Sequence, residues 1–162
     1  MIKDCVPAAV LAVCLALSAA PAALADPADY PYAGVIEVAT PHDFDTLYDR
    51  TVAAIEAHEM LVLASPSASR GAAGRGITIP GNAVIETYRN DFAVRMLAAS
   101  IPAGIEAPLR LYLTEGADGT ATITYRQPTA VFAPYGSPDL DAMAAELDAI
   151  VAAIVADAAA PE

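Results

Sequence analysis

Residues 108–126 have the sequence PLRLYLTEGADGTATITYR, and this segment decides the fold because it predicts a β-hairpin. Apolar and polar side chains alternate in both halves, as in two antiparallel strands that bury one face. Residues 116–119 (Gly-Ala-Asp-Gly) fit a type I turn followed by a glycine bulge. This turn predicts cross-strand pairs of Thr114 with Thr120, Tyr112 with Thr122, and Arg110 with Thr124. The hairpin therefore has one apolar face and one polar face.

Three further strands precede the hairpin. Alternation predicts the first at residues 34–38, and short apolar runs predict a second at 60–64 and a third at 82–88. Residues 65–82 are rich in Ser, Ala and Gly and favour at most one or two helical turns, because glycine weakens helices.

Three helices complete the pattern. Thr40 and Pro41 predict the N-cap and first position of a helix over residues 41–58, and Asn90 is the predicted N-cap of a shorter helix that ends near residue 100. Ser137 and Pro138 begin the last helix, which carries a single apolar stripe: Leu140, Met143, Ala144, Leu147, Ile150, Val151, Ile154 and Val155. The order β-α-β-β-α-β-β-α favours an α+β fold, a two-layer, mostly antiparallel sheet with helices on one face.

The N-terminus predicts export. Lys3 precedes an apolar run over residues 6–20, which is followed by an Ala-Leu-Ala site at 23–25. These features are typical of a secretory signal peptide, and the run is shorter than the roughly 20 residues of a spanning helix. We therefore predict a signal peptide at 1–25, a tether at 26–33 and a single domain at 34–158, in a periplasmic or secreted protein with no membrane association after cleavage.

Composition restricts the partners of the mature chain. Eight basic and 20 acidic residues give a net charge of −12, and removal of residues 1–25 takes away one of each sign. Nucleic-acid binding needs Lys and Arg to neutralise phosphates, so this balance opposes it. Both cysteines, Cys5 and Cys14, lie in the signal peptide, so the mature chain has neither a disulfide nor a thiolate.

The two histidines offer little chemistry. On one helix, His42 and His58 would lie about 24 Å apart, too far to share an ion. A loose surface site of His42 with Asp43 and Asp45, or a Cu(I) site of His58 with Met60, is conceivable. His58 also suits the C-terminal end of a helix as a cation. No hydrolase or phosphate-loop motif appears in the sequence. We therefore predict no catalytic residue, no metal ligand and no cofactor.

From Val35 to Tyr135 the chain resembles the domain of unknown function 302 family. The resemblance is carried, in order, by Gly76-Ile77-Thr78-Ile79-Pro80, Tyr88-Arg89-Asn90, Pro108-Leu109-Arg110, Asp118-Gly119 and Tyr125-Arg126-Gln127-Pro128. One position departs from it, because the family usually has Asn-Pro where this chain has Asn90-Asp91. The resemblance implies a two-layer fold similar to the TATA-binding-protein-like arrangement, and it implies no activity.

The polar face of the predicted sheet is the candidate ligand surface. Its six candidate residues are Arg110, Arg126, Tyr112, Thr124, Tyr88 and Glu86. Two arginines beside tyrosines are suited to bind a carboxylate or phosphate bidentately. The alternative is a face that is merely solvated or that forms a dimer, since antiparallel sheets commonly leave one face wet.

These observations favour a non-enzymatic binding module for a small molecule or a protein. The alternatives are a homodimeric structural or interaction protein and, less favoured, a periplasmic copper carrier or an enzyme.

Overall fold

The computed structural model describes residues 30–161. The predicted signal peptide, residues 1–25, and the first half of the tether, residues 26–29, lie outside this range. The elements in chain order are β1 (Val35–Ala39), α1 (Phe44–Ala57), β2 (Leu61–Ala64), α2 (Ala68–Ala73), β3 (Asn82–Tyr88), α3 (Asn90–Ala99), the 3-10 helix η2 (Ile101–Glu106), β4 (Leu109–Glu115), β5 (Ala121–Arg126), α4 (Pro128–Phe132), η3 (Ala133–Tyr135) and α5 (Pro138–Ala159). The α+β class predicted from the sequence is confirmed.

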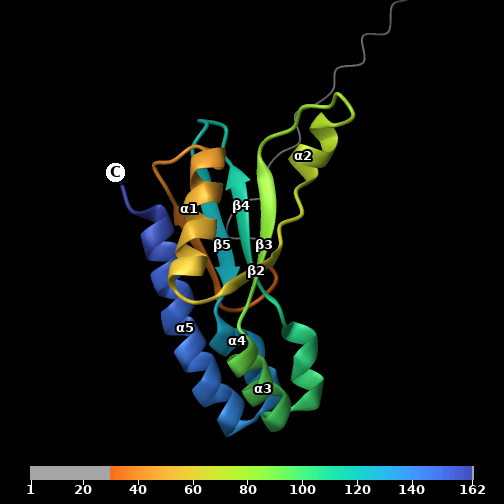
Figure 1. Ribbon diagram of the computed structural model, residues 1–162, viewed down its shortest axis with the longest axis vertical. Helices are drawn as coiled ribbons and strands as arrows, with labels where there is room; N and C mark the ends of the chain where they lie inside the picture. The colour runs from red at the N-terminus through yellow and green to blue at the C-terminus, as the bar shows by residue number, and fades with distance from the viewer. Residues whose placement is uncertain (1–29, 162) are drawn as a thin grey trace, which may run out of the picture.

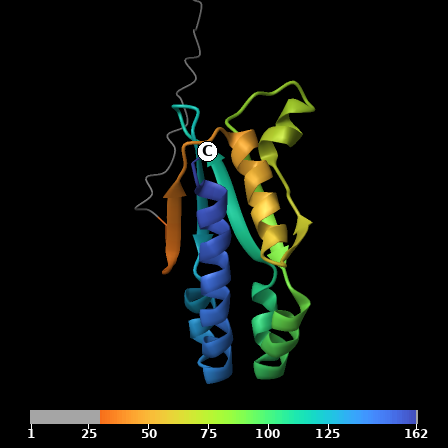
Figure 2. The same ribbon diagram turned by 60° about the vertical axis from the view of Figure 1, so that its left-hand side comes forward.

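The strands within residues 30–161 form one sheet in the order β1-β5-β4-β3-β2, and every neighbouring pair is antiparallel. Helices α1 and α5 lie on one face, and α5 extends beyond the end of the sheet, where it packs against α3 and α4 (Figures 1 and 2). Alternate strand residues point into this layer, and Ile85, Leu111, Leu113 and Ile123 are fully buried there. Burial of these side chains is the main source of the fold's stability.

The hairpin of β4 and β5 forms as predicted, but the predicted register was wrong by two residues. Thr114 pairs with Thr122 and Tyr112 with Thr124, instead of with Thr120 and Thr122. The Gly116 amide donates to the Thr120 carbonyl at 2.7 Å, so the loop consists of residues 117–119, with Gly119 at φ +83°. A shift of two residues leaves every side chain on its original face. The alternating pattern therefore determined the face but not the register.

Helix α1 begins later than predicted, because Asp43 is its N-cap instead of Thr40. The Asp43 carboxylate accepts a hydrogen bond from the Thr46 amide at 2.8 Å. The Thr40 hydroxyl donates to the Ala121 carbonyl at 2.7 Å, and the Ala121 amide donates to the His42 carbonyl at 2.8 Å. Residues 40–42 therefore continue alongside β5, and the helix starts only after this pairing ends.

The other two predicted helix starts had opposite outcomes. Arg89, not Asn90, is the N-cap of α3, and the Asn90 side-chain amide donates to the Tyr88 hydroxyl at 3.2 Å. Ser137 is the N-cap of α5 as predicted, and it accepts from the Leu140 amide at 3.4 Å. The predicted stripe of α5 is buried except for the half-buried Ile150. No helix in residues 30–161 is long and apolar enough to cross a membrane.

Candidate functional site

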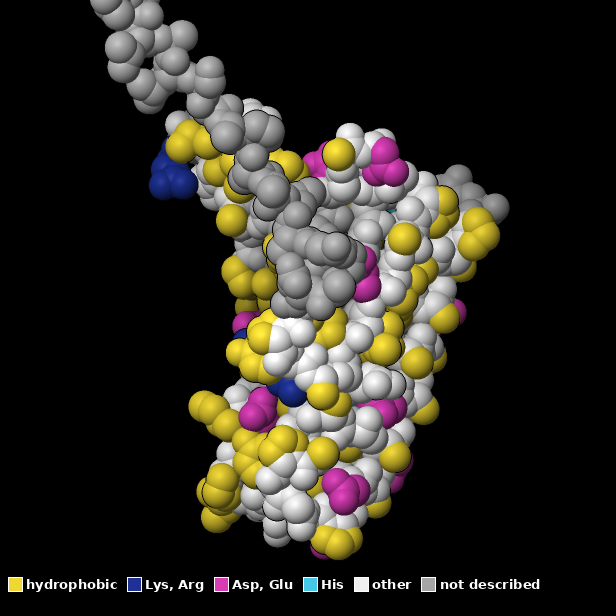
Figure 3. Space-filling model, turned by 180° about the vertical axis from the view of Figure 1, so that it is seen from behind, with side chains coloured by type: hydrophobic (Ala, Val, Ile, Leu, Met, Phe, Trp, Pro, Cys, Tyr) yellow, Lys and Arg dark blue, Asp and Glu magenta, His cyan; other side chains and the backbone are white. Residues whose placement is uncertain are grey.

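The six predicted ligand-binding residues share the sheet face that is turned away from the helices. Glu86 lies opposite Arg110 between β3 and β4, and Tyr112 lies opposite Thr124 between β4 and β5. Tyr88 and Arg126 lie two positions beyond Glu86 and Thr124 on their strands, so strand alternation places them on the same face. Figure 3 views the molecule from behind, where the basic side chains visible lower on this side lie near acidic ones.

The corrected register brings the two arginines together. Leu111 pairs with Tyr125 at the end of this ladder, so Arg110 of β4 and Arg126 of β5 follow at adjacent positions just beyond the last pair. Both residues line a hollow of about 410 Å³ together with Tyr32, Glu106, Pro108, Leu109 and Val131. We call this the arginine hollow. The other four predicted residues are not part of its lining, and Tyr88 contributes to the lining of a different cavity, together with Met96 and Met143.

The Arg126 side chain contacts an aromatic ring, but its Nε donor has no hydrogen-bond partner in the described chain. Its guanidinium carbon lies 5.0 Å from the centroid of the Tyr32 ring, in a cation–π contact. Its Nε atom is buried and has no hydrogen-bond partner among residues 30–161. Deeper on the same face, Thr124 is only 6% exposed, and its hydroxyl also lacks a partner in that range. Buried donors are usually paired, so the Arg126 Nε is an available donor beside the hollow.

Arg110 is exposed, and within residues 30–161 no carboxylate oxygen lies within 4.0 Å of either arginine of the hollow. Ion pairs elsewhere neutralise three other arginines: Arg70 with Asp45, Arg89 with Asp91, and Arg95 with Glu146. Like charges directly opposite each other on neighbouring strands are destabilising. In the described part of the chain, Glu86 lies across from Arg110 on β3, but neither arginine of the hollow has a carboxylate oxygen within 4.0 Å.

Glu106 is the acidic group of the arginine hollow, and it is already engaged. One of its carboxylate oxygens accepts a hydrogen bond from the Tyr135 hydroxyl at 2.9 Å. This bond raises the pKa of Tyr135, because it stabilises the protonated phenol. The hollow therefore combines two guanidinium groups with one carboxylate and one aromatic face.

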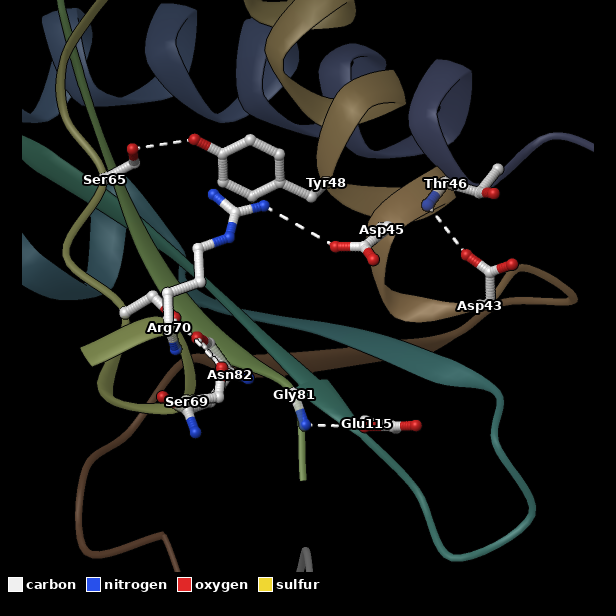
Figure 4. Close-up of polar contacts among 11 residues, drawn as sticks. Asp43, Asp45, Thr46, Tyr48, Ser65, Ser69, Arg70, Gly81, Asn82 and Glu115 are labelled. Atoms are coloured by element: carbon white, nitrogen blue, oxygen red, sulfur yellow. Dashed lines mark hydrogen bonds and ion pairs between the residues drawn. The ribbon is translucent and has the colours of Figure 1, made fainter. Parts of the chain in front are cut away.

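A second polar hollow, of about 460 Å³ between α1 and α2, contrasts with this arrangement. Arg70 lies 3.6 Å from Asp45, and its guanidinium carbon lies 4.0 Å from the centroid of the Tyr48 ring (Figure 4). At the other end of this hollow, the Glu115 carboxylate accepts from the Gly81 amide at 2.6 Å. The charged groups described here are already paired with one another or with a backbone amide, so this hollow offers few free groups to a ligand.

Both histidines contact the C-terminal end of α5. A ring nitrogen of the buried His42 lies 2.9 Å from the Ala160 carbonyl oxygen, and one of His58 lies 2.8 Å from the Asp157 carboxylate. Met60 is only 3% exposed and belongs to the core. Across residues 30–161, no three His, Cys, Asp or Glu side chains gather to hold a metal ion. In this structure the histidines therefore join α1 to α5.

Two lining residues of the arginine hollow were missed by the sequence reasoning. Tyr32 was assigned to the tether, and Glu106 precedes β4 in a 3-10 helix that was not predicted. Tyr32 reaches the hollow because β1 pairs with β5, with Val35 opposite Arg126. A prediction of which strand pairs with β1 would have identified Tyr32, since the partner of the first strand also fixes the position of the residues before it.

Comparison with known proteins supports the fold. The family model described as a domain of unknown function, DUF302, matches residues 36–158. The crystal structure of an uncharacterized conserved DUF302 protein from Bacillus stearothermophilus superimposes with a TM-score of 0.70 at 19% sequence identity, covering 79% of this chain and 99% of that one. No curated protein matches the chain. The sequence resemblance to this family is thus confirmed, and the chain belongs to the DUF302 family.

Proposed function

We propose that this protein is an exported, non-enzymatic binding module whose arginine hollow takes a small ligand with a carboxylate or phosphate group. The observation that carries the proposal is the pair Arg110 and Arg126, at adjacent positions of neighbouring strands and without a carboxylate oxygen within 4.0 Å in residues 30–161. An oxyanion between two guanidinium groups accepts charge-assisted hydrogen bonds, and it also relieves their mutual repulsion. Export is supported by the N-terminal sequence.

The ligand is expected to be small and only partly anionic. The hollow of about 410 Å³ is within the range of small-molecule sites. Pro108, Leu109 and Val131 supply apolar contact, and the Glu106 carboxylate disfavours a second anionic group at its end of the hollow. The overall charge of −12 adds a general repulsion of anions, which salt screens. One anionic group on a partly apolar body fits these conditions best.

The test is calorimetric titration and thermal unfolding of the mature chain with inorganic phosphate, hexanoate and benzoate at low ionic strength. A ligand at 100 times its Kd stabilises the folded state by about 2.7 kcal/mol, which raises the Tm by about 10 °C in a domain of this size. Arg110→Gln and Arg126→Gln should each weaken binding by about 10- to 100-fold, because each removes charge-assisted hydrogen bonds.

The matched control is Arg75→Gln, which removes the same charge from an exposed loop residue outside the hollow. It should leave the Kd unchanged apart from the small effect of net charge. Without ligand, Arg110→Gln should change the Tm little, since it removes both repulsion by Arg126 and attraction by Glu86 across the strands. If no probe binds, or if the loop variant weakens binding as much as the hollow variants, the proposal is wrong.

A further inference from the structure

The methionines of the mature chain gather at one cavity. Beyond Met1 the sequence has three methionines, Met60, Met96 and Met143. They come from three different elements: Met60 immediately precedes β2, Met96 lies on α3, and Met143 lies on α5. All three line a single cavity, together with residues of β3, α3 and α5. We call it the methionine cavity.

The methionine cavity holds a buried polar group without a partner. Thr87 lines it and is only 1% exposed, and its hydroxyl has no hydrogen-bond partner among residues 30–161. The other polar lining side chains are engaged at the surface, Tyr88 with Asn90 and Arg89 with Asp91. Methionine commonly fills gaps in hydrophobic cores. That role does not explain why the Thr87 hydroxyl lacks a partner next to space that remains empty.

The free space fits a single ion better than other guests. Its volume is about 30 Å³, less than a tenth of the 410 Å³ of the arginine hollow by the same measure. An organic ligand does not fit there. A water molecule needs about two to four polar partners, and the Thr87 hydroxyl is the one polar lining side-chain group that is not engaged elsewhere in the described chain. A monovalent soft cation needs little space and takes thioether ligands.

We propose that the methionine cavity is a Cu(I) site in which the thioethers of Met60, Met96 and Met143 are the ligands and the Thr87 oxygen faces the ion. Thioethers favour Cu(I) over harder divalent ions, and the mature sequence has no thiolate to compete for it. Its lining includes the half-buried residues Tyr88 and Pro108. The positive charge of Arg89, another lining residue, is paired with Asp91 at 2.8 Å, which reduces its repulsion of a cation.

This site is independent of the arginine hollow. The two cavities share the lining residues Pro108 and Leu109, but the methionines lie on the helix-covered face and the arginines on the opposite face. It also differs from the copper alternative weighed from the sequence, because His58 contacts Asp157 and is not part of the lining of the methionine cavity.

The experiment is anaerobic titration of the mature chain with Cu(I) in competition with bicinchoninate. Wild type should withdraw one equivalent of Cu(I). Met60→Leu, Met96→Leu and Met143→Leu keep the side-chain volume and should each weaken binding at least about tenfold, since even outer contacts of a metal site are worth that much. His58→Gln, which removes a competing nitrogen donor, and Arg126→Gln should leave the Kd unchanged.

A second measurement does not depend on the stability of the variants. In wild-type protein with ¹³C-labelled methionine methyl groups, Ag(I) should shift three methyl resonances together and saturate at one equivalent. Failure to withdraw Cu(I) from bicinchoninate would overturn the proposal. Methionine methyl resonances that do not shift on addition of Ag(I) would also overturn it. So would a Cu(I) affinity that is lost in His58→Gln and unchanged in the three methionine variants.

Discussion

Gly34 provides the sharpest test of the geometry that positions the arginine hollow. It lies two residues after Tyr32 and has φ +74°. Its carbonyl accepts a hydrogen bond from the Gln127 amide at 2.8 Å. A Cβ atom at this position would collide with the Cβ of Ala130 in α4. Gly34→Ala is therefore expected to destabilise the fold for two separable reasons, backbone strain and overpacking.

The magnitude follows from these two effects. A left-handed backbone disfavours alanine by about 1–2 kcal/mol, and the added methyl group costs about 1–3 kcal/mol in a packed contact. Alanine also lowers the conformational entropy of the unfolded chain, which offsets about 0.4–1 kcal/mol of this loss. The net loss should be about 2–4 kcal/mol, which lowers the Tm by about 7–15 °C in a domain of about 130 residues. The same change should weaken ligand binding, because Tyr32 is carried on this segment.

A double-mutant cycle separates the two effects. Ala130→Gly removes the collision partner at an expense of about 1 kcal/mol of helix propensity in α4. In the double variant with Gly34→Ala, the part of the stability loss that comes from overpacking should be recovered, and the part from backbone strain should remain. The expected coupling energy is about 1–3 kcal/mol. The assay is urea unfolding followed by far-UV circular dichroism, because the chain has no tryptophan.

The control for this cycle is Gly71→Ala. Gly71 lies in α2, and a Cβ atom there would meet nothing within 4 Å. The free energy of unfolding of the Gly71→Ala variant should equal that of wild type or exceed it by up to about 1 kcal/mol. Strictly additive effects of Gly34→Ala and Ala130→Gly, or a Gly34→Ala variant as stable as wild type, would refute the reasoning.

Three further changes should be visible in thermal unfolding. Thr124→Val removes a buried hydroxyl without a partner in the described chain and should stabilise by about 1 kcal/mol; a lower Tm would mean that the hydroxyl is bonded in solution. Arg50→Ala removes three hydrogen bonds to carbonyls at the C-terminal end of α5 and should destabilise by about 1–3 kcal/mol; an unchanged Tm would contradict this. The hydrogen bond from Arg95 lowers the pKa of Glu146 below its ordinary value of 4.5. Its contribution to stability is therefore complete above that value and is lost as the pH falls through the lowered pKa. A Glu146→Gln variant should show a shallower loss of Tm between neutral and acidic pH, and an identical acid profile would count against the ion pair.

Sequence periodicity predicted the elements well because each depends on local chemistry. β3 occupies residues 82–88 as expected, and Ser137 caps α5 as expected. The errors occurred where a distant strand competed with a local signal. Thr40 has the side chain of an N-cap, but its hydroxyl bonds to Ala121 in β5, so tertiary pairing overrode the capping preference. No property of residues 40–43 alone reveals that partner.

The candidate site was predictable in kind but not in extent. Alternation placed Arg110 and Arg126 on one face, and the structure puts both in one hollow. It also grouped Tyr112 and Thr124 with them, although these line no part of that hollow. Glu106 could not be assigned, because it lies in an irregular connection whose position depends on how α3 packs on α5.

The two-residue difference in register has a functional consequence. With the pairing inferred from the turn, Arg110 would face Thr124, and Arg126 would face Pro108. With the observed pairing, Leu111 faces Tyr125, and the two arginines follow at adjacent positions and line one hollow. Juxtaposed like charges raise the energy of the ligand-free sheet, and a sheet without a ligand gains nothing from them. Such a pair fits the general pattern in which binding sites are less stable than the fold around them requires. It is this shared hollow, in which neither arginine has a carboxylate oxygen within 4.0 Å in the described part of the chain, more than the presence of two arginines in an acidic protein, that favours an anion as the ligand.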